Sequence, residues 1–266
     1  MDVGGRRLHV ALAGAGSPTV VFDHGLGTSA ESWGRVPADV AARTRVFVYD
    51  RAGLGRSDPA PRPRSAQDIV NDLRAALAGA DVLPPYVLVG HSFGGLTVRL
   101  YASQHPTDVA GIVMVDGTNE LQYARYLALV PAEERDDWRR RYEGENAEGV
   151  KLEESAAQVR AAAPLPLVPL VVVTAGRPPG PMPDSSVDVL RLQRVRSELQ
   201  EELATRVPSG RQVIAERSGH FVQQDQPDLV VEVVLSVVEQ TRRSWRRDRG
   251  GDGAASASDE LPSKHQ

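Results

Sequence analysis

The chain has 266 residues, 41% of them apolar and 25% charged, which is enough for a globular domain with a substantial buried core. The net charge of −4 argues neither for nor against an anionic partner, and the absence of cysteine excludes disulfides, thiol catalysis and cysteine-ligated metals. No apolar run suffices for a signal peptide or a membrane span of about 18 residues. We therefore expect a cytoplasmic protein that binds neither membrane nor nucleic acid.

Short apolar, β-branched runs recur along the chain. The first, Arg7–Gly14, is interpreted as an antiparallel entry strand. Runs that are apolar throughout are typical of strands buried on both faces, as in a parallel sheet. The six strands predicted in this way are Thr19–Asp23, Arg45–Asp50, Tyr86–Gly90, Gly111–Asp116, Pro169–Gly176 and Arg211–Glu216.

Helical patterns lie between these runs. Residues 66–80 place Ile69, Val70, Leu73 and Leu77 on one face, and residues 92–104 and 228–240 are also predicted helices. Strands that alternate with helices predict an α/β fold with a mostly parallel central sheet and helices on both faces.

One connection, residues 118–166, is too long for a simple loop. It has no strand pattern and is helical and highly charged, as in "PAEERDDWRRRYEGENAEG". A solvated helical insertion fits this pattern, and so does a cap over the carboxyl end of the sheet, where ligands of such folds bind. We expect a core of residues 1–117 and 167–241, a helical cap at 118–166 and a disordered tail at 242–266.

The segment "GHSFG", Gly90 to Gly94, fits the pattern G-x-S-x-G between a strand and a helix. Only glycine fits beside a serine in such a strained turn, which raises the hydroxyl above the sheet and next to a helix N-terminus. A glycine-rich turn with no chemistry is the alternative. The strand before it and the helix after it favour a nucleophilic role for Ser92.

A serine nucleophile requires donors for an oxyanion. The backbone N–H of Phe93, the residue after the nucleophile, is one candidate. "HGLG", which comprises His24, Gly25, Leu26 and Gly27, follows an earlier strand and is predicted to aim the Leu26 N–H into the same site.

The chain resembles α/β-hydrolase-fold proteins of the branch that contains esterases, haloalkane dehalogenases and cofactor-free haloperoxidases. The resemblance rests on "HGLG", "YDRAGLGRSD" (Tyr49–Asp58), "GHSFGG" and "SGHFVQQDQP" (Ser218–Pro227), in that order, and covers residues 6–240. It implies an α/β-hydrolase fold with a nucleophile, an acid and a histidine in that chain order.

The resemblance implies a base on the loop after the last strand, and His220 in "RSGHF" stands there. In most of the family the acid follows the penultimate strand, where the first carboxylates here are Asp184 and Asp188. A subgroup instead carries the acid after the strand that follows the nucleophile helix, where Asp116 stands. We favour Asp116, with Asp184 or Asp188 as the alternatives.

The dehalogenases use a carboxylate nucleophile, so a serine at position 92 favours acyl transfer. We expect a serine hydrolase that cleaves a small-molecule carboxylic ester through an acyl-enzyme, with no metal and no cofactor. A receptor-like binding protein with little turnover, and a perhydrolase or haloperoxidase that uses the same triad, remain alternatives. Asp50 and Arg51 are expected to fix their loop without a chemical role, and the sequence leaves the oligomeric state open.

Overall fold

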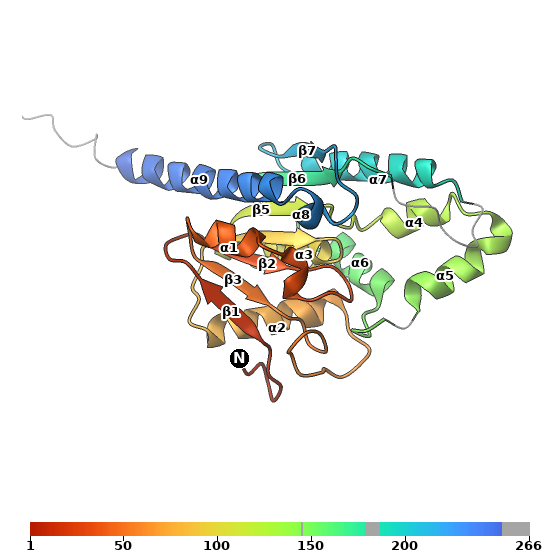
Figure 1. Cartoon of the computed structure of the whole chain (residues 1–266), viewed down its shortest axis with the longest axis horizontal. Coiled ribbons are helices and arrows are strands. Elements are labelled where there is room, and N and C mark those ends of the chain that lie inside the picture. The colour runs from red at the N-terminus through yellow and green to blue at the C-terminus, as the bar shows by residue number, and fades with distance from the viewer. Residues whose placement is uncertain (145, 179–186, 252–266) are drawn as a thin grey trace, which may run out of the picture.

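A computed structural model describes residues 1–144, 146–178 and 187–251 of the chain, with side chains described as far as residue 246. Its strands form one sheet in the order β1-β3-β2-β4-β5-β6-β7 (Figure 1). The strands are β1 (Val10–Ala13), β2 (Thr19–Asp23), β3 (Val46–Tyr49), β4 (Tyr86–His91), β5 (Val109–Val115), β6 (Leu170–Ala175) and β7 (Arg211–Ala215).

The predicted sheet is confirmed. Strand β1 runs antiparallel to β3, and every other neighbouring pair is parallel. Because β2, β4, β5 and β7 are parallel and lie in one sheet, their carboxyl ends meet at one edge. The segments that follow these four strands hold the predicted oxyanion loop, nucleophile, acid and base, so the sheet places all of them at that edge.

The central strands are mostly apolar because helices cover both faces of the sheet. Leu88 packs into one core with α2 (Ala66–Gly79), α3 (Gly94–Gln104) and the end of α7 (Val189–Ala204). The neighbouring residues Val87 and Val89 pack on the opposite face, against α1 (Val36–Ala41) and α9 (Pro227–Gly251). Alternate side chains point to opposite faces of a strand, so both cores require apolar residues from the same run.

The long insertion forms helices α4 (Gln122–Leu127), α5 (Arg135–Glu143) and α6 (Leu152–Ala161). Helix α6 packs on α2 and α3, and the Ser155 hydroxyl accepts a buried hydrogen bond of 3.0 Å from the Ala66 amide. Figure 1 shows α4 and α5 beyond the end of the sheet at which β5 ends. The aromatic residues Tyr126 and Trp138 of this part pack against a small apolar cluster of Val130, Val187 and Leu192.

The helices differ from the prediction at several places. Helices α1 and α8 (Val222–Asp225) were not predicted. Helix α7 was not predicted, although Leu192, Leu199 and Leu203 recur at helical spacing and are buried. Helix α9 continues to Gly251, so residues 242–251 are helical and not part of a disordered tail. Thr241 is buried and Arg242 donates to the carbonyls of Ser17 and Arg43, which ties the helix to the core beyond residue 241.

The rest of the predicted tail, residues 252–266, lies outside the described residues. No helix among the residues described combines the length and the apolar character needed to cross a bilayer.

Candidate active site

Ser92 occupies a sharp turn between β4 and α3. Its φ of +52° lies in the left-handed region, which a non-glycine residue rarely adopts. The Ser92 amide donates to the Val115 carbonyl at 3.2 Å, and the Ser92 carbonyl accepts from the amides of Gly95 and Thr118 at 2.9 and 2.8 Å. These bonds to the neighbouring strand and its following loop hold the strained turn in place.

The two glycines of the motif are required by space. A Cβ on Gly90 would lie 2.5 Å from the Gly94 carbonyl oxygen, and one on Gly94 would lie 2.4 Å from the Asp23 carbonyl oxygen. In both cases the obstacle is backbone, which cannot swing away. The predicted reason for glycine beside the serine is therefore seen directly in the packing.

The structure brings Ser92, His220 and Asp116 together. His220 Nε2 lies 2.9 Å from Ser92 Oγ, and His220 Nδ1 lies 2.7 Å from Asp116 Oδ2. A carboxylate only accepts, so in this arrangement Nδ1–H donates to Asp116 and Nε2 is left to accept the Ser92 hydroxyl proton. This is the proton connection that a serine nucleophile needs.

Asp116 is fully buried and follows β5, with a φ of +46°. Its Oδ1 accepts from the Ala175 amide at 3.2 Å and from Nε of Arg196 at 3.0 Å. Burial raises the pKa of Asp116, but the charge of Arg196 and the hydrogen bond from His220 outweigh burial, so the pKa lies below its usual value. The carboxylate is therefore ionised at neutral pH.

Of the two alternative acids, Asp188 does not meet His220. Asp188 is exposed and caps the start of α7, where its side chain accepts from the Leu190 amide at 2.9 Å. Asp184 lies outside the described residues.

The predicted oxyanion loop runs directly beside the serine. A Cβ on Gly25 would lie 2.9 Å from His91 Nδ1 and 3.4 Å from Ser92 Cβ, so only glycine lets the loop approach this closely. In the described part of the chain, the amides of Leu26 and Phe93 donate no hydrogen bond to another residue. Two free N–H groups thus lie on the segments that flank Ser92.

His24 has a structural place in this loop. Its Nδ1 lies 3.1 Å from the Gly25 carbonyl and its Nε2 accepts from the Arg51 amide at 3.3 Å. Burial and the nearby Arg51 lower its pKa well below the usual value, so the ring is neutral.

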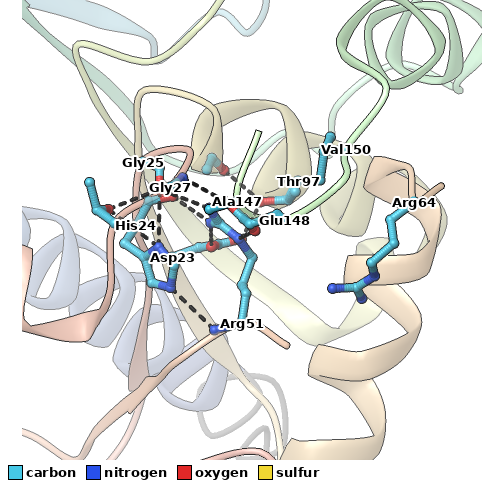
Figure 2. Close-up of polar contacts among 12 residues, drawn as sticks. Asp23, His24, Gly25, Gly27, Arg51, Arg64, Thr97, Ala147, Glu148 and Val150 are labelled. Atoms are coloured by element: carbon cyan, nitrogen blue, oxygen red, sulfur yellow. Dashed lines mark hydrogen bonds and ion pairs between the residues drawn. The ribbon is translucent and has the colours of Figure 1, made fainter. Parts of the chain in front are cut away.

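Arg51 supports the oxyanion loop through buried hydrogen bonds. Figure 2 shows its buried guanidinium between Asp23, the backbone of His24 and Gly25, and Glu148 of the insertion. It donates to Asp23 at 2.6 Å, to the His24 and Gly25 carbonyls at 2.5 and 2.8 Å, and to both Glu148 oxygens at 2.6 and 2.8 Å. Arg51 therefore fixes its surroundings as expected, and it reaches the loop that carries Leu26.

Glu148 connects the insertion to the same loop. Its Oε1 also accepts from the Gly27 amide at 2.8 Å (Figure 2). Burial lowers the pKa of Arg51, but Glu148 and Asp23 outweigh burial and raise the pKa, so the guanidinium stays charged. The Arg51 side chain also lies over the Phe93 ring, 5.5 Å from its centroid.

The ring of His91, the residue before Ser92, lies beside that of His220, with centroids 4.7 Å apart. Its Nε2–H donates to the His220 carbonyl at 3.0 Å. Burial and the neighbouring His220 lower the pKa of His91 to about 3, so the ring is neutral. His91 anchors the loop that presents the base.

Two residues of this site, Arg196 and Glu148, were not predicted from the sequence. Arg196 of α7 contacts Asp116 and His220, and Glu148 contacts Arg51 and Gly27. Their partners lie 24 to 121 positions away along the chain, and no local motif marks either residue.

Among the residues that the structure describes, no group of three or more His, Cys, Asp or Glu side chains is placed to hold a metal ion. The polar groups around Ser92 are engaged with one another, and their donors and acceptors match the needs of proton transfer.

Comparison with known proteins places this chain in a family. A model described as "Alpha/beta hydrolase family" matches residues 20–233. The uncharacterized protein YqjL of Bacillus subtilis (strain 168) is 40% identical over 103 residues, which are 39% of this chain and 41% of that protein. The chain thus spans less than half the length of the curated relatives first matched.

Two solved structures share the fold. A thermophilic esterase from Thermogutta terrifontis has a TM-score of 0.63 and 17% identity, with 89% of this chain and 94% of that chain covered. The enol-lactonase from Burkholderia xenovorans LB400 has a TM-score of 0.64 and 18% identity, with 89% and 98% covered.

Proposed function

This chain belongs to the alpha/beta hydrolase family, and on that premise we propose that it is a serine hydrolase that cleaves a small-molecule carboxylic ester. The observation that carries the proposal is the hydrogen-bonded chain from Ser92 through His220 to Asp116 at a strained turn between strand and helix. Serine nucleophiles are recognised by this geometry of nucleophile, base and orienting acid.

In the first half-reaction, Ser92 Oγ attacks the ester carbonyl carbon and its proton passes to His220 Nε2. The N–H groups of Leu26 and Phe93 hold the oxyanion, and each such donor contributes about 10²- to 10³-fold to turnover. The carbon–oxygen bond then breaks, and the alcohol leaves with the proton from His220. An acyl group remains on Ser92.

In the second half-reaction, His220 takes a proton from water, and the resulting hydroxide attacks the acyl carbon. The bond to Ser92 Oγ breaks, His220 returns the proton to the serine, and the carboxylic acid leaves. Asp116 keeps the imidazole in the tautomer with Nδ1–H and stabilises its charged form in both steps.

The insertion at residues 118–166 is proposed as the cap of this site. Tyr126 from α4 contacts the Arg196 side chain, which in turn contacts Asp116 and His220. From a second direction, Glu148 contacts the oxyanion loop through Gly27. The insertion therefore borders the site on two sides, and its side chains would select the acyl or the alcohol group.

The test is turnover of a panel of p-nitrophenyl esters of graded acyl length by the purified protein and by Ser92→Ala. We expect hydrolysis of at least one member and its loss in the variant. A folded protein that leaves every ester intact, but is stabilised against heat by a small molecule, would contradict the hydrolase and favour a binding protein.

A further inference from the structure

The Asp116 carboxylate carries an unusual neighbour for an acid that orients a histidine. Arg196 Nε donates to Oδ1 at 3.0 Å, its NH2 group lies 2.5 Å from Oδ2, and the same NH2 donates to the Asp116 carbonyl at 3.1 Å. The Arg196 side chain is only 14% exposed, so water screens this pair weakly. The fork of the guanidinium fixes the plane of the carboxylate.

Arg196 also reaches the histidine itself. Its NH2 group lies 2.8 Å from His220 Nδ1, the atom that faces Asp116 at 2.7 Å. Without a hydrogen, Nδ1 can accept a hydrogen bond from Arg196. With a hydrogen, Nδ1 donates to Asp116, and the Arg196 NH2 group then faces a nitrogen that cannot accept. When His220 takes the Ser92 proton, both ring nitrogens carry hydrogen, and only Asp116 remains a compatible partner.

Two further titratable groups near His220 and Arg196 carry no charge. His91 from β4 and Tyr126 from α4 are both neutral, because burial lowers the pKa of His91 to about 3 and raises that of Tyr126. Asp225 of α8 (Val222–Asp225) is a carboxylate, and its Oδ2 accepts from the Ser218 hydroxyl and the Gly219 amide, the two residues before the histidine. Among the described residues, the charged side chains bonded to the His220 ring are thus Asp116 and Arg196, whose charges are opposite.

We propose that Arg196 is a positioning residue of the Ser92 site, which holds the Asp116 carboxylate in its plane and offsets its charge, so that the neutral form of His220 is favoured over the imidazolium. The proposal rests on the proposed function for its catalytic consequence, but not for its effect on the imidazole. Two roles follow, one for the guanidinium fork and one for the positive charge, and they can be separated.

Two variants separate these roles. Arg196→Gln removes both the charge and the fork, whereas Arg196→Lys keeps the charge and removes the fork. The charge sets the pH midpoint of kcat/KM on its acid side, so Arg196→Gln should move this midpoint up by about one unit and Arg196→Lys should leave it in place. The fork of the guanidinium determines the plateau value of kcat/KM. This plateau should fall in both variants by up to about 10²-fold, the cost of a misplaced catalytic group.

Arg125→Gln is the matched control. Arg125 forms an exposed ion pair with Glu198 that also bridges α4 and α7, and neither residue contacts Asp116 or His220. Its loss should change neither the midpoint nor the plateau. Thermal melting of each variant shows that the fold is retained.

The experiment is a pH titration in two forms on the same four proteins. The first is the kcat/KM profile, and the second is the NMR titration of the His220 Cε1–H signal, which needs no turnover. An upward shift in Arg196→Gln alone supports the proposal. An unshifted NMR midpoint in Arg196→Gln, or an equal shift in Arg196→Lys, overturns it. Absence of turnover in the wild-type protein overturns the proposed function instead, and the NMR midpoints still decide the role of Arg196.

Discussion

At the scale of single residues, the orientation of His220 depends on one carboxylate. Asp116→Asn keeps the shape of the side chain, but its amide can donate to Nδ1 and so favours the wrong tautomer of the imidazole. Loss of the carboxylate in such a triad lowers turnover by about 10⁴-fold. We expect that loss in kcat for the best ester, with Ser92 and the fold intact.

The control for this variant is Asp188→Asn. Asp188 caps α7 and accepts from the Leu190 amide, a place that asparagine fills about as well as aspartate. Its activity should stay within a factor of two or so of the wild type. If Asp188→Asn lost turnover and Asp116→Asn kept it, the acid would have been assigned to the wrong residue.

At the scale of elements, the insertion and the oxyanion loop are joined by one buried side chain. Glu148 is 1% exposed and pairs with Arg51, so Glu148→Ala leaves part of a buried charge unpaired. Breaking a buried ion pair costs about 3–5 kcal/mol, and we expect the low end because Arg51 keeps Asp23. Urea unfolding measures this loss.

Activity should fall in the same variant, because the Gly27 amide loses its acceptor and the loop that carries Leu26 is held less firmly. Glu154→Ala is the matched control, an exposed glutamate of the same insertion. It should cost less than about 0.5 kcal/mol. Equal losses in the two variants would mean that Glu148 does not couple the insertion to the loop.

The elements themselves differ in how far the sequence predicts them. The central strands were predictable because burial on both faces makes each run mostly apolar, as in Val20, Val21 and Phe22 of β2. The Ser92 turn was predictable because its glycines meet backbone and tolerate no Cβ. Helix α7 was missed because its buried residues are sparse and separated by charged ones.

Polar partners across the fold were not predictable. Arg196 meets Asp116 across 80 positions, and Glu148 meets Arg51 across 97, so no spacing rule connects them. The neighbourhood of His91 and His220 depends on how the loop after β7 folds back over β4. Side-chain direction at such a junction is set by packing between distant segments rather than by local pattern.

At the scale of the whole molecule, stability should depend on buried neutral histidines. The pKa of His91 is lowered to about 3 by burial, and that of His24 is also lowered by burial and by Arg51. Below pH 6.5 the unfolded chain binds protons that the folded protein excludes, so each ring makes the unfolding free energy fall as the pH falls. The stabilisation is therefore fully present above pH 6.5 and is lost toward pH 3.

His91→Gln isolates one of these contributions, because the glutamine amide nitrogen can take the place of His91 Nε2 as a donor to the His220 carbonyl and does not titrate. The stability difference between the wild type and this variant should change in favour of the variant by about 1.4 kcal/mol for each pH unit below 6.5. Urea unfolding at pH 7, 6 and 5 measures it. A difference that stays constant over this range would mean that His91 is protonated in the folded protein.

The central claim is that the fold activates one serine, and covalent labelling tests it most directly. A fluorophosphonate reacts with an activated serine hydroxyl whatever the natural substrate is, and mass spectrometry of the digested protein locates the adduct. The account predicts a single adduct on Ser92 and none in Ser92→Ala. An adduct on another serine, or equal labelling of Ser92→Ala, would contradict it.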